Sequence, residues 1–176
     1  MEIQRLSIEG VAIFMEMIAS KISNLLFVKK LYESATLPAK GSKYAAGLDL
    51  YANNYNGMEG DKKEWTFSIN PGETIKIGTG IAVEIPEGYF GGIYARSGLA
   101  TKQGLAPANK VGVVDSDYRG EVIVALHNHS TMPQFIHKND RIAQLVIQPY
   151  LDVVPEVITD LTDTERGEGG FGSSGS

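Results

Sequence analysis

An arginine, a serine and a glycine stand together at Arg96-Ser97-Gly98, between a stretch that alternates like a β-strand and a stretch that favours a short helix. The first N–H groups of a helix have no partner within it, so together with a guanidinium and a hydroxyl they can bind an anion such as phosphate. The same residues also fit an ordinary helix start with a surface arginine. Local sequence therefore predicts a candidate phosphate site and leaves the structural interpretation open.

A second cluster lies at 112–120, where an apolar strand runs into a polar turn and a new strand begins at Glu121. We interpret it as a hairpin that crowds two carboxylates, Asp115 and Asp117, against the ring of Tyr118. Such crowding is unusual for a plain β core. A hairpin rich in Asp and Gly is also ordinary turn chemistry, so local sequence does not decide between the two interpretations.

The end of the chain carries a third cluster, in which Arg166 and Phe171 combine a phosphate-binding group with a stacking surface on a glycine-rich support. After Pro155 the hydrophobic alternation fades, so we predict a tail that is mobile without ligand. The spacing Gly167-x-Gly169-x-x-Gly172 occurs in this tail. No strand leads into it and no helix is expected after it, so a dinucleotide-binding interpretation fails.

The elements that must position these clusters are mostly strands. From Lys43 onward, apolar residues recur at every second position, which predicts half-buried strands. Turn residues separate them at 70–72, 86–88 and 138–140, roughly at the spacing of a sandwich or barrel. Beyond residue 43, a single short helix is expected to start near Ser97. The clearest alternations are Ile75 and Ile77, then Ile81, Val83 and Ile85, then Val122, Val124 and Leu126.

The first thirty residues have a different period, with apolar side chains at intervals of three and four, and this predicts an amphipathic helix. We interpret it as an extension that packs on its own oligomer, with partner binding or membrane-surface contact as alternatives. The domain boundaries follow from these changes of pattern: an extension at 1–30, a β core at 31–155 and a tail at 156–176. The periodic residues are Ile8, Val11, Met15, Ile18, Ile22 and Leu25.

The composition fits one globular domain, with 176 residues of which 43% are hydrophobic. A net charge of -5 argues against a general nucleic-acid surface, and the absence of cysteine excludes disulfides and thiolate chemistry. The apolar run at 11–15 is far shorter than the roughly 20 residues of a membrane span. Glu2, Glu9 and Glu16 make a poor signal or transit peptide. We expect a cytoplasmic or nuclear protein with neither nucleic acid nor membrane as partner.

Five segments match, in order and spacing, the five motifs of the trimeric dUTPase family, over about residues 31–175. Any one match could arise by chance, but five collinear motifs could not plausibly do so. The chain therefore resembles this family. The segments are Ala46-Gly47-Leu48-Asp49-Leu50, Arg96-Ser97-Gly98-Leu99-Ala100, 112–120, Asp140-Arg141-Ile142-Ala143-Gln144-Leu145 and 166–175.

The resemblance implies an all-β, jelly-roll-like β-clip subunit that forms a threefold homotrimer with active sites shared between chains. It implies hydrolysis of dUTP to dUMP and pyrophosphate, which supplies dUMP for thymidylate synthesis and keeps uracil out of DNA. Mg2+ is the implied cofactor, held through the triphosphate and its waters, with Asp49 as a supporting acid. In-line displacement needs positioning and charge stabilisation more than a covalent nucleophile.

The resemblance also assigns roles to single residues. Asp115 matches the catalytic base, which deprotonates a water that attacks the α-phosphorus. Tyr118 matches a ring that lies against the deoxyribose and excludes a 2′-hydroxyl, and Phe171 is expected to cover the uracil. The residues expected to bind substrate are Arg96, Ser97, Gly98 and Gln144 around the phosphates, Asn109 and Gly112 near the uracil, Tyr118, and Arg166, Phe171, Gly172 and Ser173 in the tail.

Two other functions stand as alternatives. A dCTP deaminase shares the implied fold and part of the motif set, but the intact Asp115 segment and the glycine-rich tail argue against it. A non-catalytic nucleotide-binding trimer would be expected to lose a site residue, and none is lost. His127 and His129 share one strand face, which suits a metal, but no third ligand is in view and we interpret them as structural or interface residues. Trp65 is interpreted as a packing residue in a variable connection.

Overall fold

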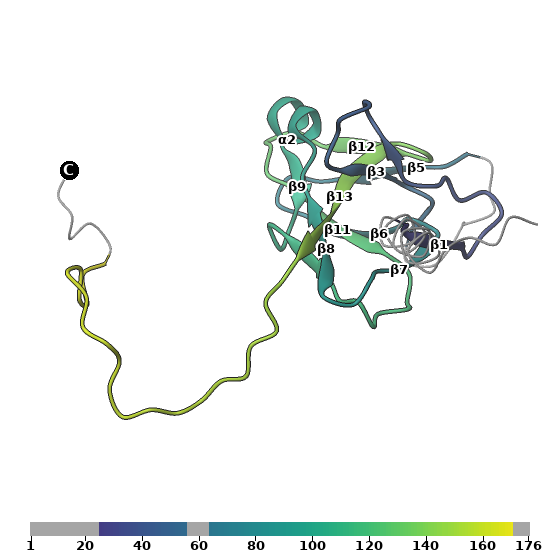
Figure 1. Cartoon of the computed structure of the whole chain (residues 1–176). Helices are drawn as coiled ribbons and strands as arrows, with labels where there is room; N and C mark the ends of the chain where they lie inside the picture. The colour runs from purple at the N-terminus through teal and green to yellow at the C-terminus, as the bar shows by residue number, and fades with distance from the viewer. Residues whose placement is uncertain (1–24, 56–63, 171–176) are drawn as a thin grey trace, which may run out of the picture.

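The computed structural model describes residues 25–55 and 64–170, and nearly all of their regular structure is β (Figure 1). The expected all-β class and the helix starting at Ser97 are confirmed. The elements are β1 (Phe27–Lys30), β2 (Ala39–Lys40), β3 (Leu48–Tyr51), β4 (Asn54–Tyr55), β5 (Thr66–Ile69), β6 (Thr74–Gly78), β7 (Ile81–Glu84), β8 (Tyr89–Tyr94), α2 (Ser97–Gln103), β9 (Leu105–Pro107), β10 (Gly112–Val114), β11 (Ile123–Asn128), β12 (Gln134–His137) and β13 (Arg141–Pro149).

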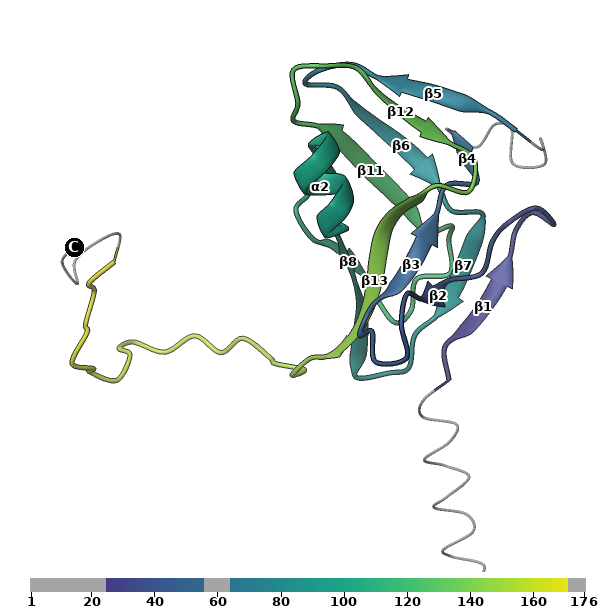
Figure 2. The same cartoon turned by 90° about the horizontal axis from the view of Figure 1, so that it is seen from above.

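The described strands pair antiparallel and form two main sheets. One sheet has the order β10-β8-β13-β3-β2 and the other the order β4-β6-β11-β9. Two smaller sheets, β1-β7 and β12-β5, complete the described set. In Figure 2 the β12-β5 pair lies beyond β6 and β11, while β1 lies beside β7 at the other end of the body.

The core between the sheets is aliphatic, and each fully buried Leu or Ile contributes about 1.5–3 kcal/mol relative to exposure. The predicted alternation is confirmed in β6, where Ile75 and Ile77 are buried and Lys76 is exposed. β7 differs because Ala82 is buried as well, so both faces of that strand are covered. The largest apolar side chains that are almost fully buried are Leu50, Ile69, Ile77, Ile81, Leu105, Val122, Val124, Leu126, Ile136, Ile142 and Leu145.

The three predicted turns form, and each has one residue in the left-handed region that a side chain other than that of Gly or Asn rarely adopts. In the first, the N–H of Glu73 donates to the carbonyl of Asn70 at 3.0 Å. In the second, the N–H of Tyr89 donates to the carbonyl of Pro86 at 3.2 Å, which carries the chain from β7 into β8. The residues with positive φ are Gly72 (75°), Gly88 (81°) and Asn139 (67°).

The segment after β10 is not the hairpin that the sequence predicted. β10 pairs with β8, whereas β11 pairs with β6 and β9, so the two strands belong to different sheets. Residues 115–122 carry the chain from one sheet to the other, and the new strand begins at Ile123 instead of Glu121. A local pattern shows strand, turn and strand, but it does not show which strands pair, because pairing is decided by the whole sheet.

The N-terminal prediction is corrected in one part. Residues 27–30 were included in a helical extension, but they form β1, which pairs with β7 along its whole length, so the helical prediction was wrong there. Residues 1–24 lie outside the described residues, and the amphipathic helix stays a prediction. Among the helices within 25–55 and 64–170, none has the length and hydropathy to cross a membrane.

Trp65 packs as the sequence predicted. Its ring centroid lies 5.1 Å from that of Phe67, which in turn lies 4.2 Å from the ring of Tyr55. The indole N–H donates to the carbonyl of Asn53 at 3.0 Å, so the polar end of the ring is satisfied. These contacts give Trp65 a structural role at the start of β5.

After β13 the chain leaves the β body as an extended segment (Figures 1 and 2). The side chains of residues 151–168 are exposed, and several of them are apolar. Leu151 is 81% exposed, Val154 90%, Val157 99% and Leu161 84%. One chain does not bury this series, which leaves it available to another surface.

Candidate active site

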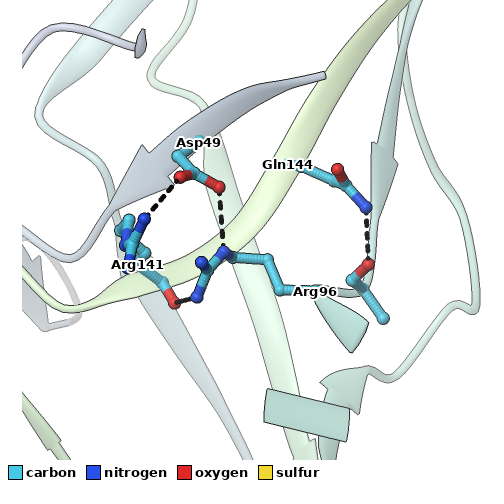
Figure 3. A network of polar contacts seen from close by, with 5 residues as sticks. Asp49, Arg96, Arg141 and Gln144 are labelled. Carbon is cyan, nitrogen blue, oxygen red and sulfur yellow. Dashed lines mark hydrogen bonds and ion pairs between the residues drawn. The ribbon is translucent and has the colours of Figure 1, made fainter. Parts of the chain in front are cut away.

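Arg96 lies between the end of β8 and the start of α2, and one carboxylate holds it (Figure 3). Its Nε donates to Oδ1 of Asp49 at 2.8 Å, and its Nη1 donates to the carbonyl of Arg141 at 3.2 Å. Nη1 of Arg141 donates to Oδ2 of Asp49 at 3.2 Å. The three residues come together because β3 and β13 are neighbours in the sheet and pair at Tyr51 and Arg141.

This Asp49–Arg96–Arg141 cluster carries one positive charge in excess. The side chain of Asp49 is only 12% exposed, compared with 24% for Arg96 and 51% for Arg141. A nearly buried carboxylate is costly unless it is paired, so the two guanidinium groups stabilise it. Within the described residues, Nη2 of Arg96 has no hydrogen-bond partner. The cluster therefore offers a held but unsaturated cation to an anionic ligand.

The first turn of α2 adds backbone donors beside Arg96. Arg96 occupies the N-cap position with an extended backbone, φ -84° and ψ 128°, and makes no side-chain capping hydrogen bond. Ser97 and Gly98 are exposed in this turn, whose N–H groups lack intrahelical acceptors. A Cβ added at Gly98 would meet no atom within 4 Å. Packing within the chain does not require glycine there, and the space is open to a ligand or another chain.

Gln144 joins the cluster from β13. Its Nε2 donates to the carbonyl of Ala95 at 2.9 Å (Figure 3). A Cβ added at Gly47 would lie 2.7 Å from Oε1 of Gln144 and 3.2 Å from its Cβ, so glycine at 47 makes room for this side chain. Gln144 pairs directly with Asp49, and both point to the face of the sheet away from the core. The first, second and fourth matched segments therefore converge.

Asp115 follows β10 and opens the 115–122 connection. The N–H of Tyr118 donates to the carbonyl of Asp115 at 3.2 Å, which closes a turn and leaves the Asp115 side chain exposed. Asp115 and Asp117 line an open groove of about 1180 Å³. The apolar lining of this groove comes from Leu25, Phe27, Ile85, Pro86, Phe90, Val113 and Tyr150.

Asn109 and Gly112, both expected near a base, lie against each other. A Cβ at Gly112 would come within 3.2 Å of Nδ2 of Asn109, so the amide packs over the glycine. Between them, Lys110 has φ 64°, and the N–H of Val111 donates to the carbonyl of Asn109 at 2.7 Å. This tight loop places the amide of Asn109 at the entrance to β10.

The Asp115 segment and the Arg96 cluster lie at opposite ends of β8. The register of β10 against β8 places Asp115 level with Phe90, whereas Arg96 is six residues further along the chain. At about 3.3 Å per residue this separates them by roughly 15–20 Å. Asp49 lies further away still, on β3, with β8 and β13 between it and β10. One chain does not bring Asp115 to a phosphate held at Arg96.

The tail residues also lie apart from both clusters. Arg166 belongs to the segment that leaves the body in Figure 1, and its Nε donates to the carbonyl of Gly169 at 2.8 Å. Phe171, Gly172 and Ser173 lie outside the described residues, so their expected roles stay predictions.

Sequence reasoning missed Arg141 as a member of the site, although it lies within the fourth matched segment. The register of β13 against β3 shifts between Arg141 and Ala143, and Ile142 and Ala143 are both fully buried. This irregularity lets Arg141 and Gln144, three residues apart, reach the same cluster, which a regular strand would prevent. Two consecutive apolar residues within an alternating strand were the signal that could have revealed it.

The two histidines of β11 and the residue after it lie together, with ring centroids of His127 and His129 4.3 Å apart. Nδ1 of His127 lies 2.7 Å from the hydroxyl of Thr74. Partial desolvation lowers the pKa of His129 from its ordinary value, and the positive charges of His127 and Lys110 lower it further. Over the ranges that the structure describes, no three His, Asp or Glu side chains gather in a way that could hold a metal.

Known proteins match this chain over most of its length. The model of the dUTPase family matches residues 33–175. A deoxyuridine 5′-triphosphate nucleotidohydrolase from Nautilia profundicola is 46% identical over 150 residues, which cover 85% of this chain and 98% of the relative. One from Rhizobium rhizogenes is 47% identical over 139 residues, which cover 79% and 85%.

Solved structures give the same result. The dUTPase of Staphylococcus bacteriophage 80alpha with dUPNHPP superposes with a TM-score of 0.70 at 30% identity, covering 87% of this chain and 99% of that one. The dUTPase of S. aureus phage phi11, whose structure describes the coordination of a structural Mg(II) ion, has a TM-score of 0.68 at 25% identity, with 80% and 100% covered. The fold is therefore that of the dUTPases, a class of all-β nucleotide hydrolases. The chain belongs to the dUTPase family.

Proposed function

We propose that the chain hydrolyses dUTP to dUMP and pyrophosphate, supplying dUMP for thymidylate synthesis and keeping uracil out of DNA. Family membership and the names of the curated relatives favour dUTP over dCTP as substrate. The observation that carries the proposal is the Asp49–Arg96–Arg141 cluster, in which two guanidinium groups on one carboxylate lie beside the uncapped turn of α2. That arrangement suits a triphosphate.

In the proposed reaction, Asp115 accepts a proton from a water whose oxygen attacks the α-phosphorus. The bond from that phosphorus to the bridging oxygen breaks, and pyrophosphate leaves. Arg96, Ser97 and Gln144 bind the phosphates and stabilise their developing charge, and Gly98 permits close approach to the backbone. Each of these groups positions or neutralises, and no covalent intermediate is required.

The base and sugar are proposed to bind at the 109–120 region. Asn109 and Gly112 lie in contact and would face the uracil, while Tyr118 would lie against the deoxyribose. In the tail, Arg166 would add charge at the phosphates. Phe171, Gly172 and Ser173 would close over the bound nucleotide and exclude water.

Mg2+ is proposed to bind together with the triphosphate. Both oxygens of Asp49 accept hydrogen bonds from arginines, at 2.8 and 3.2 Å, so this carboxylate is suited to support the cluster and not to bind a metal directly. Such a donor set fits a cation held by phosphate oxygens and its own waters. When bound, Mg2+ would neutralise part of the phosphate charge.

The site is proposed to be shared among the chains of a homotrimer. The support is the roughly 15–20 Å between Asp115 and Arg96, which one chain cannot close without breaking its sheet. The exposed apolar residues of the tail and Val113, 62% exposed beside Asp115, offer surface that association would bury. A dUTP-hydrolysing enzyme acts where deoxynucleotides are made and used, so the cytoplasm or the nucleus is its proposed location.

The test is to incubate the purified protein and Mg2+ with dUTP, dCTP or UTP and to measure pyrophosphate and ammonia. We expect pyrophosphate from dUTP, little from UTP and no ammonia from dCTP. Ammonia release would instead support a deaminase, and binding of dUTP without product would support a non-catalytic nucleotide-binding trimer. An Arg96→Ala variant serves as the catalytic control, with Gln103→Ala on the exposed end of α2 as its matched surface variant.

A further inference from the structure

We propose that Glu121 is a positioning residue for Tyr118 and so contributes to the choice of deoxyribose over ribose. This inference rests on the proposed function, which places the Tyr118 ring against the sugar. Tyr118 is 44% exposed, so burial alone does not fix its ring. Exclusion of one hydroxyl by shape needs a ring that keeps its place to within a fraction of an ångström.

Two contacts hold the ring of Tyr118. Its hydroxyl donates to the carbonyl oxygen of Glu121 at 3.1 Å. On the other side the ring rests on Gly120, where an added Cβ would lie only 2.5 Å from Cζ of Tyr118. The ring is therefore held between a glycine that leaves it room and a carbonyl that binds its tip.

The carboxylate of Glu121 fixes that carbonyl to the body of the protein. Its Oε1 accepts a hydrogen bond from Nδ2 of Asn54 at 2.6 Å and from the N–H of Gly80 at 2.7 Å. Asn54 is 1% exposed and lies in β4, so the anchor is rigid. Gly78 makes the contact geometrically feasible, because a Cβ there would overlap both Asn54 and Glu121.

The residue after Glu121 is fixed as well. The N–H of Val122 donates to the carbonyl of Ile81 at 2.8 Å, and the hydroxyl of Thr79 donates to the carbonyl of Val122 at 2.6 Å. Contacts thus run without a gap from buried strands through Glu121 to the tip of Tyr118. Loss of the carboxylate would release only the Tyr118 end of this series, since Val122 keeps its own bonds.

The turn that carries Asp115 is held independently. Nη1 of Arg119 donates to the carbonyl of Ser116 at 2.6 Å and to that of Tyr118 at 3.1 Å. Neither bond involves the Glu121 side chain. A change at Glu121 should therefore affect selection between sugars more than it affects turnover of dUTP through Asp115.

The experiment compares kcat/KM for dUTP and for UTP in the wild type, Glu121→Gln, Glu121→Ala, Tyr118→Phe and the double variant Tyr118→Phe/Glu121→Ala. Glu121→Ala and Tyr118→Phe should each lower the dUTP/UTP ratio about three- to tenfold, the scale of one lost hydrogen bond. Glu121→Gln should stay within about twofold, because its amide oxygen can accept the same donors. The double variant should lose no more than the larger single loss, because the two groups act in series. Glu84→Ala, an exposed carboxylate 3.9 Å from Arg119, is the matched control.

An unchanged ratio in Glu121→Ala, or losses that add in the double variant, would overturn the proposal. If Glu121→Ala does not fold, Tyr118→Phe cuts the same link from its other end, and an unchanged ratio there overturns it equally. Affinities for dUMP and UMP, measured by calorimetry, give the same ratio without turnover. A wild type that releases no pyrophosphate from dUTP would instead refute the proposed function, so the two failures are distinct.

Discussion

Replacing Gly98 by alanine should separate folding stability from catalysis. The added Cβ meets no atom within 4 Å, and Gly98 lies in the first turn of α2 with φ outside the left-handed region, so no strain is introduced. Alanine is favoured over glycine by up to about 1 kcal/mol in a helix interior and by less in a first turn, so we expect the free energy of unfolding to rise by about 0.5 kcal/mol. For a chain of this size, Tm should rise by about 1–2 °C.

Turnover should fall in the same variant. The methyl group would occupy the space through which a triphosphate reaches the N–H groups of the first turn and Nη2 of Arg96. Losing one hydrogen bond to a charged group costs about 1.5–3 kcal/mol, which lowers kcat/KM by about 10- to 100-fold. A more stable and less active protein is therefore the expected result.

The assay combines thermal melting, light scattering and pyrophosphate release from dUTP. Gln103→Ala, at the exposed far end of α2, controls for a change in helix propensity without a change near Arg96. Normal turnover with a raised Tm would refute the assignment of the open space at Gly98 to the ligand. Loss of the oligomer would refute it differently, by assigning that space to a neighbouring chain.

Three further predictions test other parts of the site. Asp115→Asn should lower kcat by about 100-fold or more without changing Tm, as expected for a lost general base, and near-normal pyrophosphate release would point to Asp117 or hydroxide instead. Arg141→Ala should lower kcat/KM for dUTP about tenfold but cost less than about 1 kcal/mol in denaturant unfolding, because its side chain is 51% exposed; unchanged kinetics would leave Arg141 a purely structural partner of Asp49. Deletion of residues 166–176 should leave a trimer of normal Tm that binds dUTP and hydrolyses it very slowly. Dissociation of that variant would make the tail structural, and full turnover would make its closure dispensable.

The strands could be predicted from sequence where one face is buried and the other exposed. In β6, Ile75 and Ile77 alternate with Lys76 because only one side meets the core. Partner strands could not be predicted in this way. The polar turn at 115–118 looks like a hairpin locally, but β10 pairs with β8, and that choice depends on contacts distant in sequence.

The site was predictable to a similar extent. Asp49, Arg96 and Gln144 were named through the resemblance, and the sheet brings them into one cluster. Arg141 was not named, because its direction depends on a register shift that local alternation does not reveal. The distance between Asp115 and this cluster was also outside the reach of sequence patterns, since it is set by the order of strands in the sheet.

The placement of Asp115 and Arg96 at opposite ends of β8 has a genetic consequence. If each site takes these residues from different chains of a closed ring, Arg96→Ala and Asp115→Asn subunits can restore activity to each other. Every ring that contains both variants then has one intact combination. Random mixing of equal amounts gives about three quarters mixed rings, each with about a third of its sites intact, so co-expression should recover about a quarter of normal activity. Two alleles that are each inactive alone would complement in one cell, whereas two alleles affecting Arg96 would not.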